Sequence, residues 1–150
     1  METIKIGSAK DSDSKELTYL YRKLYEGDEE KKFYSSKAIP SHVRFGNKIF
    51  VARDKKKVMG FCWAIWYEHI KNKGVGVIEE LYVDKECRRK KIGKKLVDAA
   101  LKFLGKNSIA VFVSTGEDMK EAQHFYESVG FTLCKSPWYV TVPKRVKSKI

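Results

Sequence analysis

The sequence predicts an α/β (α+β) fold in which helices cover both faces of one mixed β-sheet. In the middle of the chain, strand-like apolar segments are joined by short charged turns, DKKK and KNKG, as in an antiparallel meander. In the second half, a strand-like segment, an amphipathic helix and another strand-like segment follow in turn, which implies a parallel pair. The chain has 150 residues, of which 43% are hydrophobic. We therefore expect a single domain over residues 1–150, with a sheet of about seven strands.

The first half of the chain reads as one strand, two helices and a three-stranded meander. Residues 3–6 alternate as a short strand, and residues 11–14 supply N-cap residues for a helix that ends at Gly27. A second, less regular helical stretch, Glu29–Phe45, is broken by Pro40. The meander then consists of the strands Lys48–Arg53, Val58–Ile70 and Val75–Asp84.

The second half reads as a helix, a strand, a helix and two strands. Apolar residues recur at helical spacing over residues 92–104, and Gly105 ends that helix. Residues 109–114 form a β-branched and apolar strand, and Lys120–Val129 is a helix that ends at Gly130. The last two strands are Phe131–Leu133 and Tyr139–Val142. The predicted order is β-α-α-β-β-β-α-β-α-β-β.

Composition argues against several classes of protein. No segment approaches the roughly 20 apolar residues of a membrane span, and the polar N-terminus lacks a signal peptide's apolar region, so we expect a cytoplasmic protein without a membrane partner. The three cysteines, Cys62, Cys87 and Cys134, are too widely spaced for a disulfide framework or a zinc site. Cys62 and Cys134 lie in apolar segments and are expected to be buried. No histidine shows metal-ligand spacing.

Charge alone leaves the partner open. Lysine and arginine number 31 against 19 acidic residues, a net charge of +12. Such an excess attracts the phosphates of a cofactor, nucleic acid or an acidic protein, although a lysine-rich surface also serves solubility. The position of the charges is therefore more informative than their total.

The strongest functional signal lies in residues 78–101, where an apolar strand leads through a basic loop into an amphipathic helix. The first turn of a helix has backbone N–H groups without partners, and its dipole favours an anion. Gly93 allows a ligand to approach the backbone closely. Six cations surround it: Arg88, Arg89, Lys90, Lys91, Lys94 and Lys95. The segment is suited to a diphosphate, although it is neither a P-loop nor a GxGxxG fingerprint.

At this loop the sequence resembles the GNAT superfamily of N-acetyltransferases. The family's first signature is a strand ending in L-x-V, followed by R/Q-x-x-G-x-G/A at the start of a helix. Leu81–Val83 and Arg88–Gly93 correspond to it, with Lys91 in place of the first glycine. The second signature, A-x-x-F-Y-x-x-x-G-F, is matched at Ala122–Phe131, and Met119 stands where the family often has asparagine. The resemblance extends over roughly residues 3–142.

The resemblance implies that acetyl-CoA is the co-substrate and that an amine attacks it directly in a ternary complex, without a metal. A backbone N–H near Tyr82 or Val83 would bind the thioester carbonyl oxygen, and Tyr126 would protonate the leaving thiolate. The residues implied to contact acetyl-CoA are Leu81, Tyr82, Val83, Arg88, Arg89, Lys90, Lys91, Ile92, Gly93, Lys94 and Tyr126.

Two consecutive carboxylates are candidates for the general base. Glu79 and Glu80 lie in an otherwise apolar strand, where desolvation raises the pKa of a carboxyl group. Strict alternation would put them on opposite faces of the sheet. Glu79 matches the glutamate that looks like the base in small-amine members of the family, such as the polyamine acetyltransferases, so Glu79 is preferred and Glu80 is the alternative.

A second function stays open at this point. A basic module that binds nucleic acid or protein could keep this fold without transferring acetyl groups, and Lys91, Met119 and the high charge favour it slightly. The acceptor is equally open among polyamines, aminoglycosides, amino acids and protein amines. The sequence does not decide between a monomer and a homodimer.

Overall fold

The computed structural model describes residues 4–26, 46–55, 57–68 and 74–135. The chain divides into two compact units, Met1–Gly116 and Glu117–Ile150, and the single domain expected over residues 1–150 stays a prediction. The predicted helix Glu29–Phe45 and the predicted strand Tyr139–Val142 lie outside the described residues. No helix within the described ranges is long and apolar enough to cross a membrane.

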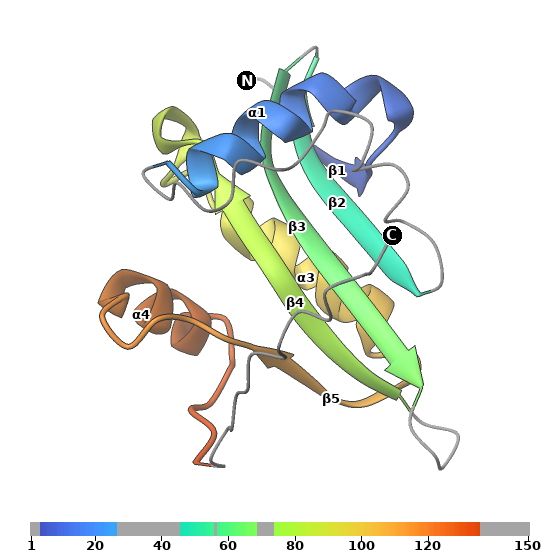
Figure 1. Ribbon diagram of the computed structural model, residues 1–150, viewed down its shortest axis with the longest axis vertical. Helices are drawn as coiled ribbons and strands as arrows, with labels where there is room; N and C mark the ends of the chain where they lie inside the picture. The colour runs from blue at the N-terminus through green and yellow to red at the C-terminus, as the bar shows by residue number, and fades with distance from the viewer. Residues whose placement is uncertain (1–3, 27–45, 56, 69–73, 136–150) are drawn as a thin grey trace, which may run out of the picture. The chain divides into compact units, whose positions relative to one another are not determined.

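A five-stranded sheet forms the centre of the first unit, in the order β1-β2-β3-β4-β5 (Figure 1). The first four strands pair antiparallel, and β5 pairs parallel with β4. The predicted meander and the predicted parallel crossover are therefore both confirmed. The strands are β1 (Lys5–Ser8), β2 (Asn47–Asp54), β3 (Lys57–Glu68), β4 (Gly74–Val83) and β5 (Ser108–Val113).

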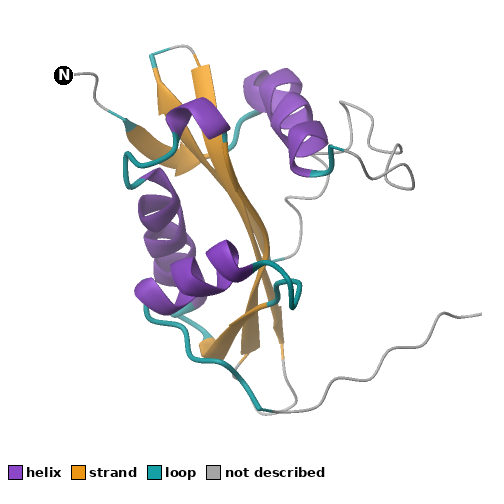
Figure 2. Ribbon diagram, turned by 90° about the vertical axis from the view of Figure 1, so that its left-hand side faces the viewer, coloured by secondary structure: helices purple, strands orange, loops and turns teal. Residues whose placement is uncertain are grey.

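Two helices lie on opposite faces of this sheet, as Figure 2 shows. On one face, α1 (Ser14–Leu24) follows a short 3-10 turn, Asp11–Asp13. It buries Leu17 and Leu20 in a cluster with Ile49, Val51, Val58, Phe61 and Tyr82. This cluster packs α1 against β2, β3 and β4.

The other face is covered by α3 (Ile92–Leu104), whose apolar stripe is buried as the periodicity predicted. Gly76 of β4 permits the close approach, because a Cβ there would lie only 3.0 Å from the Cβ of Leu104. Truncating a fully buried residue such as Leu96 to alanine should destabilise the fold by about 2–5 kcal/mol. Gly105 caps the helix where the sequence predicted its end.

The second unit contains α4 (Lys120–Ser128), which ends in a hydrogen-bonded Gly130 motif. Gly130 has a φ of 101°, and the N–H of Phe131 donates to the carbonyl oxygen of Tyr126 at 3.0 Å. This is the Schellman arrangement that closes many helices. Phe131 therefore belongs to the end of α4.

Two expectations for this region are wrong. The predicted strand Phe131–Leu133 does not form, because the backbone at residue 131 is used to close α4 and residues 131–135 have no regular structure. Cys134 is consequently exposed, whereas Cys62 in β3 is buried as expected and Cys87 is buried as well. The described residues thus hold five strands, where about seven were predicted for the whole chain.

Candidate active site

A basic loop, Asp84–Lys91, connects β4 to α3 and has an unusual backbone. It begins with a 3-10 turn, Lys85–Cys87. Arg89 and Lys91 both adopt left-handed conformations, with φ of 63° and 58°. Lys91 is the residue that replaces the first glycine of the family signature, and this φ region is the one that favours glycine. The structure therefore shows the backbone conformation that a glycine would adopt most easily at this position.

The start of α3 has no side-chain cap. Lys91 is its N-cap and makes no side-chain capping hydrogen bond, and no acidic residue lies in the first turn. Lys94 and Lys95 occupy that turn instead, although cations at a helix N-terminus oppose the helix dipole. Successive N–H groups around a left-handed residue form a concave anion site. Both the backbone and the charges therefore suit a phosphate group better than they suit the isolated helix.

Gly93 lies in the first turn of α3 with a helical backbone, since its φ is not positive. Glycine is not required there for conformational freedom, and within a helix it is less favourable than alanine by about 0.5–1 kcal/mol. The absence of a side chain beside the open N–H groups is consistent with close approach of a ligand.

Arg88 connects the basic loop to the end of β4. Its Nε donates a hydrogen bond to the carbonyl oxygen of Val83 at 3.1 Å, and its guanidinium carbon lies 5.9 Å from the centroid of the Tyr82 ring. Arg88 therefore also has a structural role in the loop. The six predicted cations of the loop and helix are all exposed, and Lys94 forms an ion pair with Asp98 at 3.3 Å.

The two candidate carboxylates lie at a β-bulge in β4. In the ladder with β3, Ile78 lies opposite Ala64 and Glu80 lies opposite Trp63, which leaves Glu79 without a partner in that ladder. Because Trp63 and Ala64 are neighbours, they face opposite sides, so Ile78 and Glu80 do too. The strict alternation assumed from the sequence is therefore wrong at this point. Glu80 faces the α1 side, where Trp63 packs on the core cluster.

The environments of the two carboxylates differ. Glu80 is partly buried, and burial raises the pKa of its carboxyl group to about 7. Glu79 is exposed. A carboxylate whose pKa is close to neutrality is suited to accept a proton. The preference for Glu79 over Glu80 as the base stays a prediction, and the burial of Glu80 favours the alternative.

The strand end Leu81–Val83 extends beyond the last pair that β4 makes with β5. That ladder ends at Ile78 opposite Val113, whereas β4 continues to Val83. The edge of β4 over residues 79–83 therefore has peptide groups that β5 does not pair. Tyr82 is buried against Phe61, with ring centroids 6.4 Å apart.

Tyr126 lies in α4, in the second unit. Its ring packs edge-on against Phe125 and Phe131, with centroid distances of 5.3 and 5.7 Å. The three rings form a small aromatic cluster at the end of α4. The role predicted for the Tyr126 hydroxyl stays a prediction.

Sequence reasoning missed Asp84, the residue that follows β4. It is 2% exposed and forms ion pairs with Lys23 of α1 and Lys57 of β3. The signal that could have found it is an acidic residue placed directly between an apolar strand and a basic loop. Within the described residues, no group of three or more histidine, cysteine, aspartate or glutamate side chains could hold a metal ion.

Comparison with known proteins places these features in a family. Residues 14–131 match the model of the acetyltransferase (GNAT) family. An uncharacterized N-acetyltransferase of Methanocaldococcus jannaschii is 26% identical over 141 residues; these cover 87% of this chain, which spans only 62% of that relative. An uncharacterized N-acetyltransferase of Archaeoglobus fulgidus is 28% identical over 137 residues, 83% of this chain and 90% of the relative.

Solved structures show the same fold. An aminoglycoside acetyltransferase from an uncultured soil metagenomic sample superposes with a TM-score of 0.78 at 24% identity, covering 93% of this chain and 97% of that one. A Trypanosoma brucei acetyltransferase superposes with a TM-score of 0.76 at 19% identity, covering 93% and 100%. Since the family model spans the basic loop, β4 and α4 together, the chain belongs to the acetyltransferase (GNAT) family, a family of acyltransferases.

Proposed function

We propose that this protein transfers an acetyl group from acetyl-CoA to a primary amine of a small molecule or a protein. One observation supports the proposal most strongly: β4 holds a half-buried carboxylate at its bulge and leads through the basic loop into an uncapped, cationic helix start. The first feature suits proton transfer from an amine, and the second suits a pyrophosphate. Family membership supports the pairing.

The residues of the basic loop fit acetyl-CoA. Its pyrophosphate would accept hydrogen bonds from the backbone N–H groups of residues 88–94, where Lys91 is left-handed and α3 is uncapped. The surrounding cations would add attraction that salt screens, since their side chains are exposed. The unpaired edge of β4 over residues 79–83 would hold the amide groups of the pantetheine arm as a neighbouring strand would. When bound, acetyl-CoA would supply the activated acetyl thioester.

We place the general base at Glu80. An alkyl amine has a pKa of about 10.4 and must lose a proton before it can attack a carbonyl carbon. Glu80 has the environment for this: it lies on the α1 face, opposite Trp63, and its pKa is raised to about 7 by burial. Glu79, which the family resemblance prefers, is the alternative, and the same pair of variants tests both.

Two further groups complete the proposal. A backbone N–H near Tyr82 or Val83 would donate to the thioester carbonyl oxygen, where negative charge develops. Tyr126 would donate a proton to the leaving thiolate. For the acceptor, the structural likeness to an aminoglycoside acetyltransferase supports including aminoglycosides beside polyamines and protein amines in the substrate panel.

The test has two steps. Thermal unfolding is measured with and without acetyl-CoA, because a ligand that binds the native state at 100 times its Kd stabilises it by about 2.7 kcal/mol. Release of free CoA is then followed with each amine of the panel. An unchanged unfolding temperature would contradict the proposal. Salt-sensitive binding of nucleic acid without binding of acetyl-CoA would support the binding module instead.

A further inference from the structure

Asp84 is an unusual residue for its position. It is the first residue after β4 and the only acidic residue of the basic loop besides Glu86, yet its side chain is only 3% exposed. A buried carboxylate is destabilising unless ion pairs and hydrogen bonds compensate it. With a net charge of +12, the protein has many cationic side chains that could form an ion pair with this carboxylate at the surface. Its burial therefore needs a physical reason.

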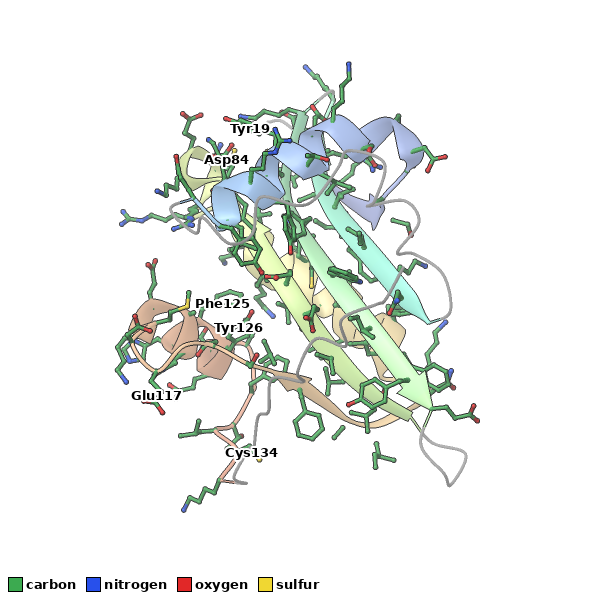
Figure 3. The ribbon with its side chains drawn as sticks, viewed as in Figure 1. Tyr19, Asp84, Glu117, Phe125, Tyr126 and Cys134 are labelled. Atoms are coloured by element: carbon green, nitrogen blue, oxygen red, sulfur yellow. The ribbon has the colours of Figure 1, made fainter. Side chains whose placement is uncertain are left out.

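The contacts of Asp84 reach three elements of the first unit: α1, β3 and the 3-10 turn of the basic loop. Its Oδ1 lies 3.7 Å from Nζ of Lys23 in the last turn of α1, and its Oδ2 lies 3.7 Å from Nζ of Lys57 at the start of β3. Its backbone N–H donates to the carbonyl oxygen of Met59, and its own carbonyl oxygen accepts from the N–H of Cys87. Figure 3 marks Asp84 at the end of β4, near the helix that carries Tyr19.

The two ion pairs are not hydrogen bonds, because 3.7 Å exceeds the usual donor–acceptor range. Within the described part of the chain, Oδ1 has no hydrogen-bond partner. The carboxylate is thus held between α1 and β3 by electrostatic attraction. Without hydrogen bonds, such buried ion pairs add little to the free energy of unfolding. This arrangement is better suited to fixing a position than to adding stability.

The basic loop requires such fixing. Two of its residues, Arg89 and Lys91, are in a backbone region that is unfavourable for side-chain-bearing residues. A strained loop keeps its shape only when its ends are held by the surrounding structure. α3 holds one end, and the other end begins at Asp84.

We propose that Asp84 is a positioning residue for acetyl-CoA binding, which fixes the start of the basic loop between α1 and β3 so that the backbone N–H groups of residues 88–94 face the pyrophosphate. The inference rests on the proposed function. Asp84 contacts neither co-substrate in this account; it acts through the loop. Lys23 and Lys57 are the two points to which the loop is anchored.

A positioning role and a purely electrostatic role of Asp84 predict opposite changes in acetyl-CoA affinity when its charge is removed. A negative charge near an anion site repels the anion, so removing the charge of Asp84 should tighten acetyl-CoA binding if Asp84 acts only as a charge. If Asp84 positions the loop, Asp84→Asn should weaken binding, because a displacement of about 1 Å can cost far more than a distant charge contributes.

The experiment compares Asp84→Asn with Asp98→Asn by calorimetric titration with acetyl-CoA. Asp98 is a matched control, since it is an exposed aspartate whose ion pair with Lys94 lies on α3. We expect Asp84→Asn to raise the Kd and the KM for acetyl-CoA on the order of tenfold while the KM for the amine changes less. Asp98→Asn should change the Kd by less than about twofold.

Lys57→Gln tests the same anchor with Asp84 in place, should Asp84→Asn fail to fold. Lys55→Gln is its control, because it removes the same charge from the same turn but not from the ion pair with Asp84. Lys57→Gln should weaken acetyl-CoA binding more than Lys55→Gln does. Equal effects of these two variants would overturn the inference, as would an unchanged or lower Kd for folded Asp84→Asn. Wild-type protein that does not bind acetyl-CoA would contradict the proposed function as well.

Discussion

Glu80 lies directly opposite Trp63 in the ladder between β4 and β3, on the side of the sheet that α1 covers. This position results from the bulge at Glu79. If residues 78–80 paired regularly, without the bulge, Glu80 would share the face of Ile78, which is buried on the α3 side of the sheet. The bulge therefore places the Glu80 carboxylate on the α1 side of the sheet, where it is only partly buried.

Exchanging each carboxylate for its amide should identify the base. Glu80→Gln should lower turnover on the order of 10²–10⁴-fold, the usual contribution of a positioned base, and leave acetyl-CoA affinity nearly unchanged. Steady-state kinetics with a saturating amine measures this. Glu79→Gln is the matched control, and a large loss in Glu79→Gln with a small one in Glu80→Gln would reverse the assignment.

The same variant should change how stability depends on pH. The pKa of Glu80 is about 7 in the native state against 4.5 when unperturbed, so the native state binds more protons than the unfolded state between these values. The contribution of Glu80 to stability therefore falls as pH rises from about 4.5 to about 7. The melting temperature of Glu80→Gln should exceed that of the wild type at pH 8 and equal it at pH 4. An increase in melting temperature that is the same at pH 4 and pH 8 would argue against a titrating Glu80.

The sequence was sufficient to predict those elements that depend on residues close together in the chain. The helix over residues 92–104 was predicted to the residue, since its apolar spacing and Gly105 are both local features. The anion site expected from the cations and the helix start stays a prediction. The bulge at Glu79 was not predictable, because an unpaired residue is defined only by the register with β3. Asp84 was missed for a similar reason: its burial depends on Lys23 and Lys57, which are distant in sequence.

Lys91→Gly should stabilise the protein. Lys91 has a φ of 58°, a conformation that is unfavourable by roughly 1 kcal/mol or more for a residue with a side chain. After allowing for the greater flexibility of glycine in the unfolded chain, we expect a gain of about 0.5–1 kcal/mol, measured by urea unfolding. Lys90→Gly is the control, because Lys90 does not have a positive φ, and it should destabilise. Similar effects of the two variants would show that the backbone at Lys91 is not strained.

Tyr126→Phe should separate a catalytic hydroxyl from a structural one. The ring contacts with Phe125 and Phe131 do not involve the hydroxyl, so the variant should keep the aromatic cluster of α4. If the hydroxyl protonates the leaving thiolate, turnover should fall at least about tenfold while the melting temperature and acetyl-CoA affinity stay nearly the same. A lower melting temperature with normal turnover of the folded fraction would assign the hydroxyl to packing.

The most direct test of the account is a calorimetric titration of acetyl-CoA into the wild type, Gly93→Val and Lys90→Ala. If the backbone at the start of α3 binds the pyrophosphate, a β-branched side chain at residue 93 should obstruct it and weaken binding far more than loss of the exposed Lys90 side chain, whose charge solvent and salt screen. We predict a loss of at least about tenfold for Gly93→Val and less than about threefold for Lys90→Ala. Small and equal losses in the two variants would contradict backbone recognition of acetyl-CoA at this loop.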